Sequence, residues 1–186
     1  MKALVCSDFG STQDLTLEQR EDLEPGAGEV LIDVKAAGVN FPDILTVEGK
    51  YQFKPELPFI PGTEVSGVVT KLGKGVATRK VGDEVVGMVQ IGGFASQVVT
   101  SEYTTFPKGS SMSYEQAAGF AVTYGTSYYA LKQRAQLQPG ETVLVLGAAG
   151  GVGIATIQIA KAMGATVIAA ASTEEKLDFA CEAGAD

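Results

Sequence analysis

One segment constrains the fold more than any other: residues 142–161, which read TVLVLGAAGGVGIATIQIAK. It begins with strand-forming residues, continues with a run of glycine and alanine, and ends with apolar residues at helical spacing. A glycine-rich turn between a strand and a helix opens backbone N–H groups at the helix N-terminus, where the helix dipole attracts an anion. The segment therefore predicts a strand, a turn and a helix that together can cradle a phosphate group.

The elements after this turn extend the prediction to a nucleotide-binding unit. We expect a strand over 142–146, a helix over 151–163, a second strand over 166–170 and a second helix over 173–183. A βαβα run of this kind is the first part of a Rossmann fold, in which a dinucleotide pyrophosphate lies at the first helix N-terminus. The alternative is a glycine turn with a purely structural role.

The glycines of the turn have distinct expected roles. Gly150 would allow close approach to the phosphates and Gly153 close packing of helix on strand, while Ala148 stands where the dinucleotide fingerprint usually has its first glycine. The candidate cofactor-binding residues of the turn are Gly147, Ala148, Ala149, Gly150, Gly151, Val152 and Gly153.

The end of the second strand indicates which cofactor is bound. An NAD-specific site places an acid about 20 residues after the fingerprint. From Gly153 to Ser172 is 172 − 153 = 19 positions, and no acid stands there. Ser172 and Lys176 could offer a hydroxyl and a charge to a 2′-phosphate, which favours NADPH. Glu174 and Glu175 weaken this argument, and the alternative is that Ser172 or Thr173 caps the next helix.

The chain before this unit has a different pattern. Short alternating runs at 30–34, 65–72, 84–89 and 95–99 are separated by glycine and proline, which predicts a compact β-rich domain. From Ser113 the spacing becomes helical and continues through Leu131, with a Ser-x-x-Gln capping signal at Ser113 and Gln116. We place the domain boundary near Val122, so that the domains are 1–122 and 123–186. The expected fold class is α/β, a β-rich domain followed by a partial Rossmann domain.

Composition excludes several classes of function. Lys and Arg number 14 and Asp and Glu 22, a net charge of −8, which argues against nucleic acid or an anionic membrane surface as partner. No apolar run is long enough to span a bilayer and no signal peptide is recognisable, so the cytoplasm is the expected location. The chain has no histidine, which removes Ser-His and Cys-His pairs and the commonest zinc ligand. The two cysteines, Cys6 and Cys181, are expected to be reduced and structural.

Several segments carry a family resemblance. They are GETVLVLGAAGGVGIATIQIAK, AAGVNFPDILTVEGKY, LPFIPGTEVSGVV, VGDEVVG and AAGFAVTYGTSYYAL, and they cover nearly all of the chain in order and spacing. The chain resembles the zinc-independent medium-chain dehydrogenase/reductases, specifically the quinone oxidoreductase or zeta-crystallin branch. This resemblance implies a GroES-like catalytic domain followed by a Rossmann domain, with the nicotinamide in the cleft between them.

The resemblance also implies that the site holds no metal. Zinc-dependent relatives bind catalytic metal with cysteine, histidine and cysteine, and the corresponding positions here are Asn40, Thr63 and Gly119. The segment between Cys6 and Cys181 contains no cysteine, so the structural zinc lobe is also missing. We therefore expect no metal site.

The resemblance assigns roles to individual residues. Asn40 matches the residue that faces the nicotinamide and the acceptor, Tyr51 matches a tyrosine at the mouth of the cleft, and Thr63 could line the same pocket. We take these three as candidate catalytic residues, the alternatives being a turn or cap asparagine, a half-exposed structural tyrosine and a turn threonine. Thr123 matches a threonine beside the nicotinamide ring, and Asp43 is expected to cap a short helix over 44–47.

The expected activity is transfer of hydride or electrons from NADPH to a quinone or related conjugated carbonyl compound, a small-molecule acceptor. One alternative is an enoyl thioester or alkenal reductase of the same superfamily. Another is a non-catalytic truncated product, because the sequence stops after two strands of the nucleotide-binding sheet. Full-length family members commonly form homodimers, which is doubtful for this chain. The open side of the strand 142–146 is expected to be unpaired and apolar.

Overall fold

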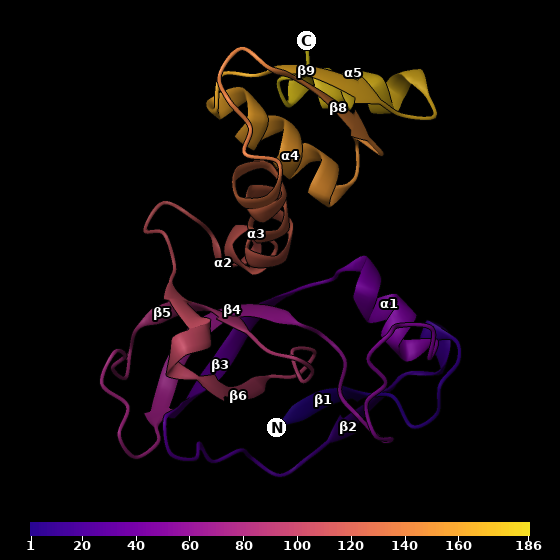
Figure 1. Cartoon of the computed structure of the whole chain (residues 1–186). Coiled ribbons are helices and arrows are strands. Elements are labelled where there is room, and N and C mark those ends of the chain that lie inside the picture. Colours follow the sequence, from indigo (N-terminus) through magenta and orange to yellow (C-terminus); the bar gives the residue numbers. More distant parts are fainter. The chain divides into compact units, whose positions relative to one another are not determined.

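The computed structural model describes residues 1–186, which form two compact units, Met1–Gly119 and Phe120–Asp186 (Figure 1). We call them the N-terminal unit and the C-terminal unit. The division falls near the boundary expected after residue 122. No helix combines the length and the apolar character needed to cross a membrane.

The N-terminal unit is built on a five-stranded sheet with strand order β6-β3-β4-β5-β7, in which every neighbouring pair is antiparallel. Its strands are β3 (Glu29–Gly38), β4 (Glu64–Leu72), β5 (Glu84–Met88), β6 (Gln97–Ser101) and β7 (Thr105–Pro107). A separate antiparallel pair is formed by β1 (Lys2–Val5) and β2 (Thr16–Gln19). The four runs predicted as strands correspond to β3 to β6, whereas β1, β2 and β7 were missed.

The core of the sheet depends on glycines that make room for one side chain. Ile32 is fully buried at the centre of β3. A Cβ added at Gly67 of β4 would lie 2.1 Å from the Asp33 carbonyl oxygen and 2.8 Å from Ile32 Cγ2, and one at Gly87 of β5 would lie 2.8 Å from Ile32 Cδ1. Because real side chains do not approach this closely, the isoleucine fits only where its neighbours have no side chain. These two glycines thus fix how β3 packs within the sheet.

Short helical elements complete this unit. They are η1 (Thr12–Asp14), α1 (Phe41–Val47), η2 (Glu102–Thr104) and α2 (Tyr114–Ala118). The capping box predicted for α2 is confirmed: the Gln116 N–H donates to Ser113 Oγ at 3.2 Å and the Ser113 N–H donates to Gln116 Oε1 at 3.0 Å. The helical spacing predicted from Ser113 through Leu131 is confirmed, with one interruption: α2 ends at Ala118, and its C-cap Gly119 has φ and ψ of −97° and 12°, outside the helical range.

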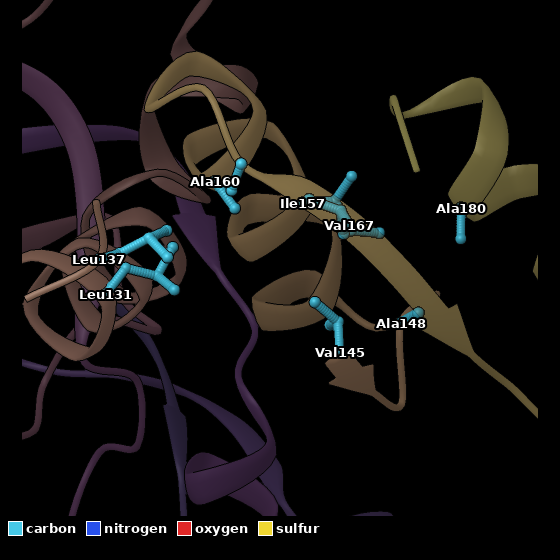
Figure 2. Close-up of a cluster of buried hydrophobic side chains, with 9 residues drawn as sticks. Leu131, Leu137, Val145, Ala148, Ile157, Ala160, Val167 and Ala180 are labelled. Atoms are coloured by element: carbon cyan, nitrogen blue, oxygen red, sulfur yellow. The ribbon is translucent and has the colours of Figure 1, made fainter. Parts of the chain in front are cut away.

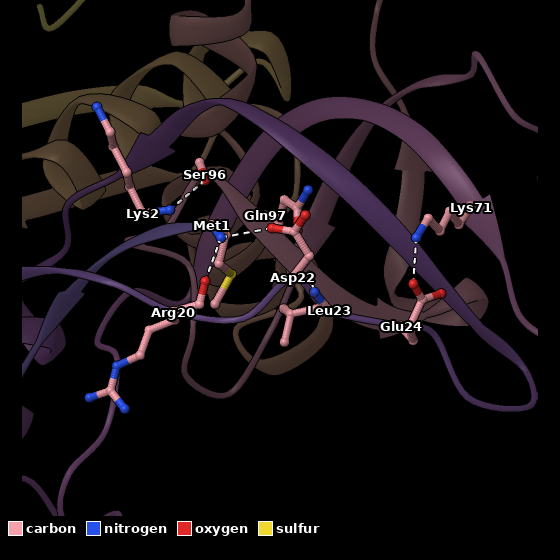
Figure 3. Close-up of polar contacts among 9 residues, drawn as sticks. All are labelled: Met1, Lys2, Arg20, Asp22, Leu23, Glu24, Lys71, Ser96 and Gln97. Carbon is pink, nitrogen blue, oxygen red and sulfur yellow. Dashed lines mark hydrogen bonds and ion pairs between the residues drawn. The ribbon is translucent and has the colours of Figure 1, made fainter.

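Polar contacts hold the amino terminus against the segment after β2 and join β1 to the residues before β6 (Figure 3). The Met1 amino group donates to the Arg20 carbonyl at 2.6 Å and to Asp22 Oδ1 at 2.7 Å. The Lys2 N–H donates to Ser96 Oγ at 3.0 Å, just before β6. Backbone groups of β1 and its neighbours are therefore satisfied by the sheet edge they lie against.

The C-terminal unit contains the predicted βαβα run. It comprises α3 (Ala121–Tyr128), the π-helix η3 (Tyr129–Arg134), β8 (Thr142–Leu146), α4 (Gly151–Ala162), β9 (Thr166–Ala170) and α5 (Glu174–Glu182). β8 and β9 pair in parallel from Thr142 with Thr166 to Leu146 with Ala170. The predicted strands have the observed bounds, and each predicted helix differs from the observed one by a residue at one or both ends.

An apolar cluster holds these elements together. Figure 2 shows Ile157 of α4 beside Val167 of β9 within it, and both side chains are fully buried. The other buried members are Leu131, Leu137, Val145, Ala148, Ala160, Ala165 and Ala180. The small residues among them let α4 lie close to the two strands.

The outer face of this sheet is partly open. β8 pairs with β9 alone, and Leu144, Leu146 and Ile168 are 59%, 75% and 49% exposed. This confirms the expectation of an unpaired, apolar side on the strand 142–146. The fold of the unit therefore depends on the face of β8 and β9 that α4 covers.

We predict that Ile157→Ala lowers the free energy of unfolding by about 2–5 kcal/mol, because it opens a cavity in the buried cluster. The matched control is Ile168→Ala, whose half-exposed side chain lies on the open face, and it should cost about 1 kcal/mol or less. Urea unfolding followed by circular dichroism compares the two. Equal losses would show that the cluster does not stabilise the unit.

Candidate functional site

A hollow of about 590 Å³ lies in the C-terminal unit where β8 and β9 end. It is lined by Leu146, Gly147, Ala149, Gly150, Ala170, Ala171, Ser172 and Lys176. Because the two strands are parallel, their carboxyl ends meet at this edge. The first turn of α4 begins at the same edge, and its N–H groups have no acceptor within the helix. The hollow thus combines a helix N-terminus with a glycine-rich wall.

The turn between β8 and α4 is held by backbone hydrogen bonds. The Ala148 N–H donates to the Ala170 carbonyl at 3.1 Å, and the Gly150 N–H donates to the Gly147 carbonyl at 3.0 Å. Gly147 has a φ of 64°, a left-handed conformation that a side chain disfavours. Ala148 is fully buried within the cluster of Figure 2 and does not line the hollow. The turn is therefore tied to the end of β9 as well as β8.

Gly150 and Gly153 differ in how much space the surrounding atoms leave for a side chain. At Gly153 an added Cβ would lie 2.5 Å from the Gly147 carbonyl oxygen and 2.6 Å from that of Ala148. At Gly150 the only close atom is the Gly147 oxygen at 3.4 Å, and the φ of −79° and ψ of 165° suit any residue. The fold thus requires glycine at 153, whereas the open space at 150 faces the hollow.

The far side of the hollow is formed by the end of β9 and the start of α5. Thr173 is the N-cap of α5, since its hydroxyl accepts the Lys176 N–H at 3.3 Å. Ser172 has no capping role and instead accepts from Lys176 Nζ at 3.3 Å. Glu174 and Glu175 line a different hollow. Of the two capping alternatives, Thr173 is the residue that caps, and Ser172 with Lys176 faces the candidate site.

Thr123 lies against the glycine turn from the preceding helix. A Cβ at Gly151 would lie 3.2 Å from Thr123 Cγ2, so the methyl group covers the start of α4. Below it, the buried Ser127 hydroxyl lies within donating distance of two carbonyls, that of Thr123 at 2.8 Å and that of Val152 at 3.1 Å. Thr156 adds a hydrogen bond of 3.0 Å to Ser127. Polar groups thus fix α3 on α4 at the turn.

In the N-terminal unit, Asn40 and Thr63 meet around buried carboxyl groups. Asn40 is the N-cap of α1, and its N–H donates to Asp43 Oδ2 at 2.7 Å. The Thr63 hydroxyl, just before β4, donates to Asp43 Oδ1 at 3.3 Å. The Asn40 amide donates from Nδ2 to Glu64 Oε1 at 2.9 Å. The expected helix over 44–47 with Asp43 as its cap was wrong in its start, because α1 begins at Phe41 and Asn40 is the N-cap. Asp43 instead contributes to the helix start from the third helical position, and the same carboxyl also holds Thr63.

Burial is the main influence on Asp43. Its side chain is 3% exposed, and burial raises the pKa of the carboxyl above its ordinary value. The hydrogen bonds from Asn40 and Thr63 act in the opposite direction, since both favour the ionised form. Glu64 is fully buried, and a Cβ at Gly38 would lie 2.6 Å from its Oε1. Glycine at 38 is thus needed for the carboxylate that holds Asn40.

Tyr51 is not joined to this network. It follows α1 and is partly buried, and its N–H donates to the Leu45 carbonyl at 3.0 Å. No hydrogen bond of its hydroxyl links it to Asn40 or Thr63 within the structure. The structure therefore joins two of the three candidate catalytic residues through Asp43 and shows no hydrogen bond from the third to either of them.

Sequence reasoning missed several residues of these sites. Leu146, Ala170 and Ala171 line the hollow because they end the two parallel strands, a signal that the strand prediction already contained. The link from Glu64 to Asn40 joins residues 24 apart in sequence and has no local signal. No group of three or more His, Cys, Asp or Glu side chains in the structure could hold a metal ion.

Comparison with known proteins identifies the family. The model of the alcohol dehydrogenase GroES-like domain matches residues 26–130, and the zinc-binding dehydrogenase model matches residues 151–186. The chain belongs to the medium-chain dehydrogenase/reductases, in the quinone oxidoreductase branch. The N-terminal unit is thus the GroES-like domain and the C-terminal unit is the beginning of a Rossmann domain, which confirms the predicted fold class.

Relatives in this family match the chain over nearly its whole length. It is 42% identical over 186 residues to the quinone oxidoreductase-like protein 2 homolog of Nematostella vectensis, covering 99% of this chain and 50% of that protein. It matches the Escherichia coli quinone oxidoreductase complexed with NADPH with a TM-score of 0.95 and 33% identity, covering 100% of this chain and 57% of that one. The CurK enoyl reductase matches with a TM-score of 0.91 and 34% identity, covering 100% and 58%. The chain spans about half the length of the curated relatives it matches.

We predict that Gly153→Ala lowers the free energy of unfolding of the chain by about 1–3 kcal/mol, because the new methyl group forces α4 away from the turn after β8. Thermal unfolding measures the loss. Gly125→Ala is the control, since no atom lies within 4 Å of a Cβ there and the position is helical. An alanine at 153 that is as stable as the control would contradict the close packing.

Proposed function

We propose that the protein containing this chain is an NADPH-dependent reductase. It delivers reducing equivalents from NADPH to a quinone or related conjugated carbonyl compound, without a metal ion. The observation that carries the proposal is the space in front of Gly150. Nothing in the fold requires glycine there, yet the position faces the hollow at the start of α4. A missing side chain at a helix N-terminus suits the close approach of a pyrophosphate.

The residues around the hollow fit the rest of this cofactor. The first-turn amides of α4 would hold the pyrophosphate by hydrogen bonds. The Ser172 hydroxyl and the Lys176 ammonium lie 3.3 Å apart on the far side, where they would bind a ribose 2′-phosphate. The absence of an acid at the end of β9 avoids repulsion of that phosphate. These features support NADPH over NADH.

The acceptor side of the proposal rests on Asn40 and Thr63. When bound, NADPH supplies the hydride, and the protein has to orient the acceptor and stabilise charge on its oxygen. A carboxylate only accepts hydrogen bonds, so Glu64 fixes the Asn40 amide with its NH2 group turned toward it. The second N–H of that group remains to bind an acceptor oxygen. A mechanism without metal is supported by the residues at the positions that correspond to the zinc ligands of zinc-dependent relatives, which here are Asn40, Thr63 and Gly119.

A second candidate function is reduction of an enoyl thioester. It is favoured by the match to the CurK enoyl reductase, whose TM-score and identity are close to those of the quinone oxidoreductase. The two candidates share the cofactor site and differ in the acceptor. Tyr51, whose hydroxyl is outside the Asn40 network, is the candidate proton donor for that reaction. Rates with a quinone and with a crotonyl thioester in the full-length protein separate the two functions.

We predict that Gly150→Val weakens NADPH binding by about 10- to 100-fold, because the side chain displaces the pyrophosphate from amides whose charged hydrogen bonds contribute about 1.5–3 kcal/mol. NADPH fluorescence titration of the chain measures the dissociation constant. Gly125→Val is the control in the same unit. Unchanged affinity in a folded Gly150→Val variant would refute the pyrophosphate site.

The preference for NADPH should depend on Lys176. We predict that Lys176→Met weakens NADPH binding up to about fivefold, the strength of an exposed ion pair, and leaves NADH binding unchanged. Lys132→Met, at an exposed position on η3, is the charge-matched control. The same fluorescence titration with both cofactors tests this. Equal weakening for NADPH and NADH would place Lys176 outside the 2′-phosphate site.

A further inference from the structure

Asp43 is a buried carboxyl that helix capping alone does not account for. One oxygen, Oδ2, accepts the Asn40 N–H at 2.7 Å, which completes the helix start. The other oxygen, Oδ1, accepts the Thr63 hydroxyl at 3.3 Å and has no part in capping. Beside it lies an apolar hollow of about 310 Å³, in which Asp43 is the only charged residue. The carboxyl therefore faces apolar groups on one side and the Thr63 hydroxyl on the other.

Other titratable groups near α1 are directed elsewhere. Glu64 on β4 accepts a hydrogen bond from the Asn40 amide. Cys6 lies in the buried cluster with Val47 and donates to the Asp8 carbonyl. Glu48 and Lys50 pair with each other at 3.0 Å after the helix end. The remaining wall of the hollow is Leu4, Thr12, Leu15, Val39, Ile44, Val47 and Phe94. The Thr63 hydroxyl thus carries a proton that contacts Asp43 and can change direction by rotation of the O–H bond.

We infer that Asp43 is a positioning residue for the acceptor site, and that its protonation state sets the direction in which the Thr63 hydroxyl donates. This inference rests on the proposed function, because it takes Thr63 to face the acceptor. It goes beyond that function by assigning control of the site to a carboxyl that does not touch the acceptor.

The chemistry of the two groups gives the mechanism. A hydroxyl carries one proton, and an ionised carboxyl can only accept, so ionised Asp43 draws the Thr63 proton toward itself. Protonated Asp43 instead donates from Oδ1 to Thr63 Oγ1, and the Thr63 proton turns toward the acceptor oxygen. Burial raises the pKa of Asp43, so the switch operates at a higher pH than an exposed aspartate would allow.

Substitution of Asp43 by asparagine isolates this effect. In Asp43→Asn the amide oxygen must face the Asn40 N–H, so the amide NH2 donates permanently to Thr63. The variant keeps the cap and imitates the protonated acid at every pH. Thr63→Val removes the hydroxyl with little change in shape. It represents the opposite state, in which residue 63 cannot donate a hydrogen bond to the acceptor.

The test is a pH series of duroquinone binding to the 186-residue chain with saturating NADP⁺, which cannot reduce the quinone. For the wild type, the dissociation constant should rise about two- to tenfold as the pH passes the Asp43 midpoint, the effect of one neutral hydrogen bond. Asp43→Asn should keep the tight value throughout, and Thr63→Val the weak one. Circular dichroism establishes that each variant is folded.

A ¹³C NMR titration of the Asp43 carboxyl supplies the midpoint without any ligand. Thr63→Val should raise that midpoint further, because the lost hydrogen bond favoured the ionised carboxyl. An unchanged midpoint in Thr63→Val would overturn the inference even if Asp43→Asn failed to fold.

The outcomes separate this inference from the proposed function. Quinone binding that is independent of pH across the Asp43 midpoint, or an Asp43→Asn variant that follows the wild type, overturns the inference alone. Failure of duroquinone to bind any variant at any pH overturns the proposed acceptor site together with the inference.

Discussion

The contact between the backbone of Gly153 and the carbonyl groups of Gly147 and Ala148 is the constraint on which the C-terminal unit depends. It sets how closely α4 approaches the turn after β8, and with that the direction of the helix over the sheet. The burial of Ile157 and Ala160 against β9 requires this approach. The free amides of the first turn are consequently held at the carboxyl ends of both strands. One short-range steric requirement thus positions both the core and the candidate cofactor site.

The N-terminal unit uses buried charge where the C-terminal unit uses close packing. Asp43 and Glu64 are both excluded from solvent, and each is bound to Asn40, one through its backbone and the other through its side chain. An ionised carboxyl in such a place is costly unless it accepts hydrogen bonds, so the network requires donors around it. Asn40 and Thr63 supply them. Their side chains are therefore ordered by the interior of the unit before any acceptor is present.

The sequence could predict the features that depend on residues close together in the chain, and it could not predict those that depend on residues far apart in it. The strands and helices after residue 142 were predictable, because strand runs, a glycine turn and helical spacing follow each other without interruption. The strands β1, β2 and β7 were not, because they are only three or four residues long and, in β2, mostly exposed. The Asp43 and Thr63 pair depends on the way residues 20 apart meet beside β4, and no local pattern records that. That Asp43 takes part in capping this helix, which is local, was predictable, whereas the helix start at Phe41 was not.

At the start of α5, helix capping and lining of the hollow are carried out by two different residues. Thr173 caps the helix, and the neighbouring Ser172 lines the hollow without contributing to the cap. Position 172 can therefore change its charge while the helix keeps its first hydrogen bonds. Under the proposed function, a substitution at residue 172 would alter the choice between the two nicotinamide cofactors without a compensating change in the helix that supports it.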